Sequence, residues 1–234
     1  MNNDVEKAVV LSCSGLERRF DDGCRVIEVL RGVNLQVARG ESVAVVGESG
    51  VGKSTLLHLL GALDRADGGR VVVAGHDLFS LSSRALAAVR NRDIGFVFQF
   101  HHLLGDFDAV ENVMMPMLIA GRGGQTARHR AVEILERVGL GERLNHKPAE
   151  LSGGEQQRVA VARAVVTQPA VVFADEPTGN LDPASGTEVQ DLLRDVQHEA
   201  CCALVVATHS AQLASKMERT FRLSGGMLTE TRSL

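Results

Sequence analysis

The stretch GESGVGKST carries the residue types and the spacing that bind the phosphates of a nucleotide. It follows an apolar run, and its glycines let backbone N–H groups approach an anion while the next helix points its positive end at the phosphates. Lys53 is expected to reach the β- and γ-phosphates, and the Ser54 hydroxyl to bind Mg²⁺. We therefore predict a site for ATP and Mg²⁺. The predicted ATP contacts in this loop are Gly47, Glu48, Ser49, Gly50, Val51, Gly52, Lys53, Ser54 and Thr55.

Two adjacent acids, Asp175 and Glu176, follow an apolar run at 171–174. A carboxylate at the carboxyl end of a parallel strand lies beside a phosphate loop, so we expect Asp175 to hold Mg²⁺, through water. Glu176 points in a different direction from its neighbour, and we expect it to polarise a water for attack on the γ-phosphate. The alternative is that the two acids only cap a helix. The apolar strand before them favours ATP hydrolysis.

The stretch LSGGE at 151–155 has two interpretations. Ser152 and Glu155 have the spacing of a capping box, which begins the helix predicted over 156–168 and is the favoured interpretation on local grounds. Gly153 and Gly154 are poor helix formers, each costing about 1 kcal/mol relative to Ala. They also leave bare N–H groups at a positive helix end, as an anion site requires. The residues of this stretch alone leave both interpretations open.

Strands alternating with helices must position these residues, which predicts an α/β protein. Near-continuous apolar runs followed by helical stretches are typical of a parallel sheet covered on both faces. Alternating residues at 26–30 and 34–41 predict a small antiparallel sheet near the start of the chain, and helical patterns such as 127–140 replace strand signals between 100 and 173. The predicted strands of the main sheet are 42–47, 70–75, 94–99, 170–175 and 203–208.

Composition excludes several classes of protein. The 234 residues carry a net charge of -4 and no Trp or Tyr, which argues against nucleic acid as a main partner. The four cysteines lack zinc-ligand spacing, and the adjacent His101 and His102 point apart, so we expect no metal other than Mg²⁺. No apolar run approaches the roughly 18 to 20 residues that span a bilayer, so we expect membrane contact only through a partner.

Taken together and in order, four motifs resemble the set found in ABC transporter ATPases. They are the phosphate loop, LSGGEQQR at 151–158, VVFADE at 171–176 and VVATHS at 205–210. The resemblance covers essentially the whole chain. It implies one ATP-binding domain over 1–234, built on a phosphate-loop NTPase core with a mixed, mainly parallel sheet. An N-terminal antiparallel β subdomain and an α-helical subdomain inserted at roughly 100–168 complete the implied fold.

The resemblance also implies that two copies form a head-to-tail homodimer upon ATP binding. The LSGGE stretch of each copy then contacts the nucleotide held by the other copy's phosphate loop, and the loop at 179–182 crosses the dimer interface. The second anion site would therefore serve the partner's nucleotide. The residues implied to contact ATP in trans are Ser152, Gly153, Gly154, Glu155 and Asp182.

Three further residues take roles from the resemblance. Phe20 is similar to the aromatic residue that stacks on adenine, with a core phenylalanine as the alternative. Gln99 is similar to the residue that contacts Mg²⁺ and the attacking water and links the site to the membrane partner, and His209 to the γ-phosphate switch. Ser210 departs from the family, which usually has Asp after that histidine. The implied catalytic residues are Glu176, His209 and Gln99, and the implied Mg²⁺ ligands are Ser54, Gln99 and Asp175.

Within the family, the stretches 98–121 and 145–155 resemble the ATPases of lipoprotein-releasing systems. This implies a peripheral ATPase on the cytoplasmic face of a bacterial inner membrane that drives integral membrane permease subunits of the LolC and LolE type. The apolar residues between 114 and 118 either face that partner or belong to the core, and Pro116 is expected to break or bend any helix there. The alternatives are the ATPase of a macrolide or peptide export or mechanotransmission complex and an FtsE-like cell-division ATPase.

Overall fold

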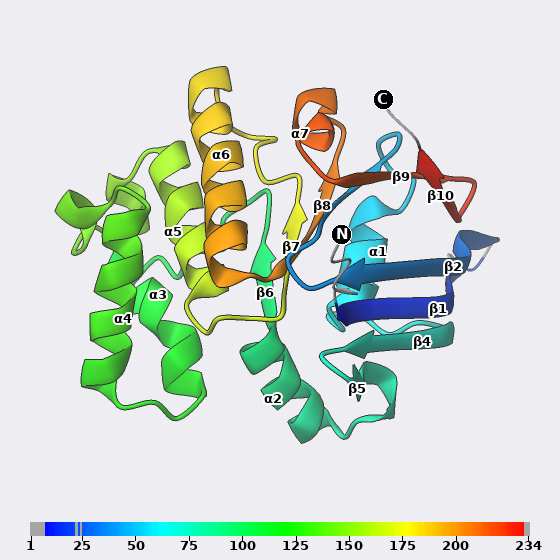
Figure 1. Cartoon of the computed structure of the whole chain (residues 1–234), viewed down its shortest axis with the longest axis horizontal. Coiled ribbons are helices and arrows are strands. Elements are labelled where there is room, and N and C mark those ends of the chain that lie inside the picture. Colours follow the sequence, from blue (N-terminus) through cyan, green and yellow to red (C-terminus); the bar gives the residue numbers. More distant parts are fainter. Residues whose placement is uncertain (1–7, 22, 24, 232–234) are drawn as a thin grey trace, which may run out of the picture.

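The computed structural model describes residues 8–21, 23 and 25–231. Within this part of the chain, a six-stranded sheet carries helices on both faces, and a four-stranded sheet lies at one end of the molecule (Figure 1). The predicted α/β class is confirmed. No described helix is both long enough and apolar enough to cross a membrane.

The larger sheet has the strand order β10-β9-β3-β8-β7-β6 and is parallel apart from β10. Its central strands are almost completely buried, because helices or the second sheet cover both of their faces. The predicted strand at 94–99 is shorter than expected and ends at Val97. The strands are β3 (Ser42–Val46), β6 (Ile94–Val97), β7 (Val171–Asp175), β8 (Ala203–Thr208), β9 (Arg219–Ser224) and β10 (Met227–Thr231).

The smaller sheet is antiparallel, with the order β2-β1-β4-β5. The stretches at 26–30 and 34–41 form one strand, β2, rather than two. The predicted placement of 70–75 in the parallel sheet is wrong. Ala74 and Gly75 adopt positive φ angles of 47° and 82° and turn the chain back into β5, so β4 is a hairpin strand that also pairs with β1. The strands are β1 (Val9–Asp21), β2 (Val26–Ala38), β4 (Gly68–Val73) and β5 (His76–Asp77).

The helices α3, α4 and α5 pack together on the side away from the smaller sheet (Figure 1). The helix predicted from 127 begins earlier, at Gly124, and α5 begins at Gly153 because the N-cap residue, Ser152, precedes both glycines. Pro116 does not break α3, which continues for three residues beyond it. The helices are α1 (Lys53–Leu60), α2 (Ser83–Asp93), α3 (Ala109–Ile119), α4 (Gly124–Arg137), α5 (Gly153–Val165), α6 (Pro183–Ala200) and α7 (Ala211–Ser215), with short 3₁₀ turns at Leu78–Ser80, Gly141–Arg143 and Pro148–Glu150.

Alternate residues of the central strands point into two cores on opposite faces of the larger sheet. Val43 and Val45 of β3 pack with α1 and the smaller sheet, whereas Ala44 and Val46 pack with the helices α3 to α6. Phe173 of β7 is fully buried in the first core, and its ring packs against that of Phe96 with a tilt of 33° between the two planes. These cores fix β3, β8 and β7 side by side, so that their carboxyl ends meet at one edge.

Candidate functional site

The carboxyl ends of β3, β8 and β7 bring together three segments that are distant in sequence. Val46 of β3 pairs with Thr208 of β8, and Ala207 of β8 pairs with Asp175 of β7. The phosphate loop follows Val46, and Glu176 follows Asp175. The crevice at this edge of a parallel sheet is the usual place for a ligand in α/β proteins.

The phosphate loop depends on glycine at two positions where another residue would collide with the fold. Gly52, which precedes α1, has a φ of 108°, and a Cβ there would lie 2.5 Å from Val29 Cγ1. At Gly47 a Cβ would lie 2.6 Å from the backbone oxygen of Leu223. The loop can therefore keep its backbone close to the floor of the site only with glycine at these positions.

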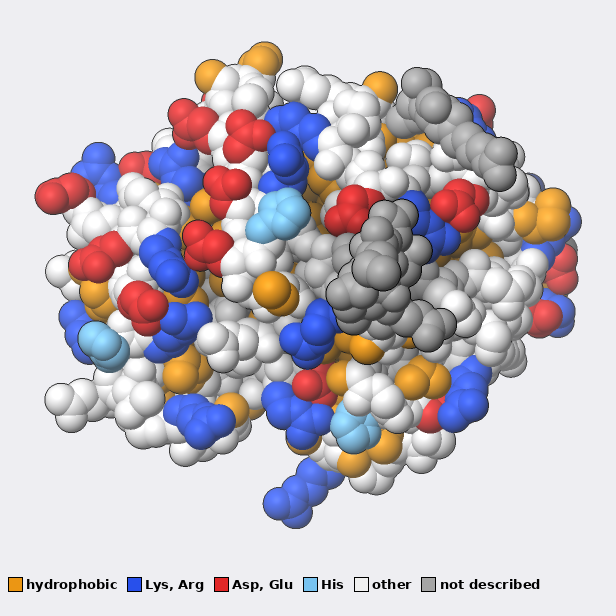
Figure 2. Space-filling view, viewed as in Figure 1, with side chains coloured by type: hydrophobic (Ala, Val, Ile, Leu, Met, Phe, Trp, Pro, Cys, Tyr) orange, Lys and Arg blue, Asp and Glu red, His pale blue; other side chains and the backbone are white. Residues whose placement is uncertain are grey.

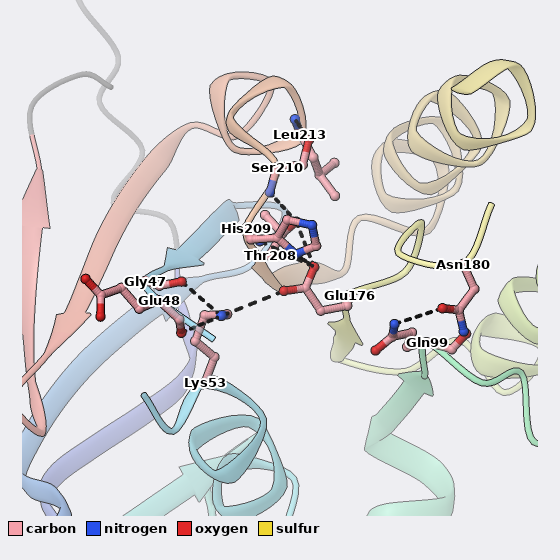
Figure 3. Close-up of polar contacts among 10 residues, drawn as sticks. All are labelled: Gly47, Glu48, Lys53, Gln99, Glu176, Asn180, Thr208, His209, Ser210 and Leu213. Atoms are coloured by element: carbon pink, nitrogen blue, oxygen red, sulfur yellow. Dashed lines mark hydrogen bonds and ion pairs between the residues drawn. The ribbon is translucent and has the colours of Figure 1, made fainter. Parts of the chain in front are cut away.

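Lys53 points back into the phosphate loop. Its ammonium donates to the backbone oxygens of Gly47 at 3.0 Å and of Glu48 at 3.1 Å, and it lies 3.8 Å from Glu176 Oε1 (Figure 3). Lys53 is only 7% exposed, so its charge is held in place by these oxygens rather than by solvent. The ammonium thus sits where the phosphates of a nucleotide would need a cation.

The carboxylate of Glu176 is held from several sides. Its Oε2 accepts from the Thr208 hydroxyl at 3.2 Å and from the His209 backbone N–H at 3.3 Å, and the imidazole Nδ1 of His209 lies 2.9 Å away. Glu176 also has a positive φ of 44°, which is unusual for a residue other than glycine. Because such a conformation costs free energy, its presence directly after a buried strand is typical of a functional site.

Asp175 and Ser54 supply oxygens that fit a divalent cation. The Asp175 Oδ1 is buried and has no hydrogen-bond partner among the described residues. Burial raises the pKa of the Asp175 carboxyl, and the hydrogen bond from the Ser54 hydroxyl and the charge of His58 partly offset this shift. A cation would satisfy the unpaired oxygen and favour the ionised carboxylate. No group of three or more histidine, cysteine or acidic residues with metal-binding geometry occurs in the described part of the chain.

Gln99 points away from this cluster. Its Nε2 donates to Asn180 Oδ1 at 3.0 Å, and Asn180 Nδ2 donates back to the Gln99 backbone oxygen at 3.3 Å (Figure 3). Gln99 lies two residues beyond the end of β6, in a bend rather than at a strand end. Within the described residues, no contact joins its side chain to Ser54 or Asp175.

Two side chains of α5 hold the segment around Gln99 in place. Gln157 Nε2 donates to the Phe98 oxygen at 3.2 Å. The Arg163 guanidinium donates to the backbone oxygens of His101 at 2.8 Å and His102 at 2.7 Å. Sequence reasoning missed Gln157 and Arg163, as well as Thr208 and Asn180. The signal that was available for Arg163 is a charged residue within the otherwise apolar run at 159–166, whereas Gln157 lies in a polar run that gave no such signal.

The amino end of α5 carries the capping box that the local interpretation of LSGGE predicted. Ser152 Oγ accepts from the Glu155 N–H at 3.2 Å, and Glu155 Oε2 accepts from the Ser152 N–H at 2.8 Å. The Ser152 N–H and, next, the Arg143 guanidinium lower the pKa of the Glu155 carboxyl to about 2. Gly153 and Gly154 lie in the first turn, so the cap is compatible with exposed N–H groups beside it. A Cβ on Gly154 would approach Ser185 Cβ to 3.1 Å, which places this end of α5 against α6.

The remaining predicted residues lie outside the cluster. Asp182 caps α6 by accepting from the N–H groups of Ala184 and Ser185, both at 3.1 Å, and Ser185 lowers the pKa of its carboxyl. Phe20 is 42% exposed on β1, with the Arg18 guanidinium 4.6 Å from its ring centre, so the core alternative for Phe20 is wrong. No described contact connects Phe20, Asp182 or Ser152 to Lys53 or Glu176.

Comparison with known proteins identifies close relatives of this chain. The sequence model of the ABC transporter family matches residues 30–179. Three similar proteins are each named lipoprotein-releasing system ATP-binding protein LolD. The Shewanella oneidensis protein is 50% identical over 94% of this chain and 96% of its own length. The Pseudomonas syringae pv. tomato protein is 52% identical over 94% and 97%, and the Geobacter metallireducens protein is 54% identical over 93% and 96%.

Solved structures of one cassette share the fold. The dimeric structure of a post-hydrolysis state of the ATP-binding cassette MJ0796, bound to ADP and Pi, has a TM-score of 0.86 and 36% sequence identity. The match covers 96% of this chain and 100% of that one. A second dimeric structure of MJ0796, a bacterial ABC transporter cassette, gives the same values.

Proposed function

The chain belongs to the ABC transporter family, and from that premise we propose that it is the ATP-hydrolysing subunit of a transporter that releases lipoproteins from a membrane. The assignment of lipoproteins as the cargo is supported by the names of relatives that are 50% to 54% identical over nearly their whole length. ATP hydrolysis is supported by one observation: Lys53, Glu176 and His209 lie together at the edge formed by β3, β8 and β7. The whole chain, 1–234, acts as one ATP-binding domain with a helical subdomain at roughly 100–168.

ATP binds in the phosphate loop. The N–H groups of the loop and the amino end of α1 face the phosphates, and Lys53 exchanges its hydrogen bonds with Gly47 and Glu48 for bonds to the β- and γ-phosphates. Phe20 stacks on the adenine ring. Because Lys53 lies between the loop and Glu176, its movement toward a phosphate also frees one side of the Glu176 carboxylate.

Ser54, Asp175 and Gln99 are the residues that would hold Mg²⁺ beside the phosphates. The buried, unpaired Asp175 Oδ1 supports this role for the acid, and the Ser54 hydroxyl is already hydrogen-bonded to the same carboxyl. When bound there, Mg²⁺ would neutralise negative charge on the phosphates. For Gln99 to take part, its side chain must leave Asn180.

Glu176 is the general base for the attacking water, and His209 is the residue that responds to the γ-phosphate. The position of Glu176 supports this role, because the residue follows the end of β7, lies 3.8 Å from Lys53 and is held by Thr208. His209 is 70% exposed on its side chain and so can turn from Glu176 toward a γ-phosphate. That movement releases a second constraint on the carboxylate.

The enzyme acts as a homodimer that forms when ATP binds. Ser152, Gly153, Gly154, Glu155 and Asp182 contact the nucleotide of the other copy. Two observations support this arrangement: the amino ends of α5 and α6 pack side by side, and no described contact joins them to Lys53 in the same chain. The dimeric state of the MJ0796 cassette supports it as well. ATP then lies between the two copies, and hydrolysis separates them.

The membrane partner is a permease of the LolC and LolE type, and the enzyme works at the cytoplasmic face of a bacterial inner membrane. A groove of about 440 Å³ between the core and the helical subdomain supports a protein partner. Phe96, Phe98, Pro116 and the exposed Ile119 line it, and so does Arg163, which holds the segment that follows Gln99. A helix seated there would reach the ATP site through that segment.

The shared active site is tested by mixing two inactive variants. Lys53→Ala removes the ammonium of a copy's own site, and Ser152→Arg blocks the site of the other copy. Each homodimer should be inactive, whereas mixing restores one working centre in every mixed dimer, or about a quarter of the wild-type rate if the centres act independently. Mixing Lys53→Ala with a second Lys53 variant is the control. Mixed dimers that form but stay inactive would contradict a shared site.

The cargo is tested separately. The wild-type chain and the Glu176→Gln variant are each co-expressed with its candidate permease, and the release of a lipoprotein from membrane vesicles is followed on addition of ATP. We expect release by the wild-type complex only. An active ATPase complex that releases no lipoprotein would leave the enzyme assigned and the cargo wrong.

A further inference from the structure

Arginines gather on one side of this net-negative protein. Residues 78–92 contain three arginines and no acid, and residues 112–132 contain three arginines, one histidine and no acid. Figure 2 shows blue side chains along the lower edge of the molecule, over α2 and the turn between α3 and α4, where red side chains are few. We call this set of six arginines the basic rim. The basic rim consists of Arg84, Arg90, Arg92, Arg122, Arg128 and Arg130.

Part of this charge is not neutralised within the protein. Arg92 pairs with Asp93 at 2.6 Å, and Arg130 pairs with Glu133 at 2.8 Å. In contrast, Arg84, Arg122 and Arg128 are exposed and form no ion pair with any described residue. The basic rim therefore keeps an excess of positive charge after its own ion pairs are counted.

A pocket of about 470 Å³ lies within the basic rim. Arg92, Arg122, His129 and Arg130 line it together with the apolar Met117, and none of its described lining residues is acidic. The pocket is formed where the ends of α2, α3 and α5 meet the beginning of α4. Arginine guanidinium groups bind phosphate oxygens strongly, so this pocket has the chemistry of a phosphate-bearing headgroup site.

Exposed apolar side chains stand next to these charges. Ile119, which also lines the groove proposed for the permease, is 68% exposed, and Leu118 is 40% exposed; both lie at the carboxyl end of α3, within four residues of Arg122. Arginines beside exposed aliphatic residues are typical of protein surfaces that rest on a membrane interface, where the charges meet lipid phosphates and the aliphatic groups meet the upper acyl region.

We propose that the basic rim binds the anionic headgroups of phospholipids, so that the chain contacts the membrane surface directly as well as through its permease. The excess of positive charge at one edge of a chain with net charge -4 also orients the molecule, because the rest of its surface is repelled by the same headgroups. This contact departs from the sequence-based expectation of membrane contact only through a partner, goes beyond the proposed transport function and can be tested without the permease.

The test is co-sedimentation of the purified chain with vesicles. Vesicles of phosphatidylcholine alone are compared with vesicles that also contain phosphatidylglycerol, at low and at high salt. We expect binding only to the anionic vesicles, and we expect salt to weaken it. The variant Arg122→Glu/Arg128→Glu should bind at least tenfold more weakly, since each arginine near an anionic surface contributes roughly fivefold.

A charge-matched variant is the control. Arg39→Glu/Arg194→Glu makes the same change in net charge outside the basic rim and should bind the vesicles like the wild type. ATP hydrolysis by both double variants should match the wild-type rate, which shows that they are folded. The proposal would be overturned if both double variants lost vesicle binding equally. It would also be overturned if the wild-type chain bound neutral and anionic vesicles equally well.

Competition distinguishes a lipid surface from a site for a free anion or a protein. Millimolar inorganic phosphate should leave the binding to anionic vesicles largely intact, because several rim arginines act together at a surface. If phosphate displaces the chain completely, the pocket is a small-anion site and the lipid proposal is wrong. If the chain binds only vesicles that contain the permease, the rim is a protein-docking surface and the lipid proposal is equally wrong.

Discussion

The imidazole Nδ1 of His209 lies 2.9 Å from Oε2 of Glu176. The two residues are more than thirty positions apart, yet each directly follows a buried parallel strand, and those strands are neighbours in the sheet. The same carboxylate lies 3.8 Å from the Lys53 ammonium through its other oxygen. One carboxylate therefore connects the phosphate loop, β7 and the segment after β8.

Replacing Glu176 with Gln should abolish most hydrolysis while ATP still binds. The amide keeps the shape of the side chain but cannot accept a proton from water, and loss of a general base lowers kcat by about 10² to 10⁴. The measurement is phosphate release together with nucleotide binding and size-exclusion chromatography. We expect a stable dimer in the presence of ATP.

Glu142→Gln is a matched control for this variant, because Glu142 is exposed and remote from the phosphate loop. It should hydrolyse ATP at the wild-type rate. A Glu176→Gln protein that hydrolyses at the wild-type rate would rule out this residue as the base.

His209→Ala should lower kcat and should do so through Glu176. Because the two side chains share one contact, their effects should not add. We expect a large loss in the wild-type background and a small further loss in the Glu176→Gln background, measured as a double-mutant cycle on kcat. Additive losses would show that His209 acts independently of the carboxylate.

Arg163→Met should destabilise the fold and slow hydrolysis. The change leaves two backbone oxygens in the segment after Gln99 without their charged donor, at a cost of about 1–3 kcal/mol in the free energy of unfolding. Urea denaturation measures this loss. Arg163→Lys should recover part of it, since an ammonium can still donate to one oxygen.

Arg137→Met is the control on the neighbouring helix α4, because the side chain of Arg137 is 55% exposed and pairs with the exposed Glu199. A surface pair contributes about 0–1 kcal/mol, so this variant should unfold nearly like the wild type. Equal destabilisation by the two variants would show that the contacts of Arg163 with the segment at 101–102 have no special role.

The capping carboxylate of Glu155 predicts a defined dependence of stability on pH. Its pKa in the folded protein is about 2, against an ordinary value of 4.5. A lowered folded-state pKa means that its contribution is fully present above the ordinary value and is lost as the pH falls toward 2. Glu155→Gln removes this titration while keeping an oxygen that can accept from Ser152.

The two proteins are compared by urea denaturation between about pH 6 and pH 3. The stability advantage of the wild type over Glu155→Gln should be constant at the upper end and shrink steadily below about pH 4.5. An advantage that does not change with pH would mean that the charge of Glu155 does not stabilise the amino end of α5.

Local sequence patterns were sufficient where a residue's neighbours in the chain decide its structure. The strand before Gly47, the helix after Lys53 and the capping box at Ser152 follow from apolar periodicity, glycine and side-chain caps, and all three are present. They were insufficient for β4, because its short run of three valines at 71–73 pairs equally well in a parallel or an antiparallel sheet. The turn at Ala74 and Gly75 decided the pairing.

The sequence by itself determined the chemistry of this protein: a phosphate loop with its lysine and serine, an acid pair behind a buried strand, and a histidine at a strand end. These are local motifs whose residue types fix what each can bind or donate. Only the tertiary structure decided which of them meet. The order β3-β8-β7 joins Lys53, Glu176 and His209, whereas Gln99 is turned toward Asn180 and the end of α5 packs against α6. The basic rim likewise exists only because folding places α2 beside the turn between α3 and α4, and net charge, as a sum over the chain, contains no such spatial information.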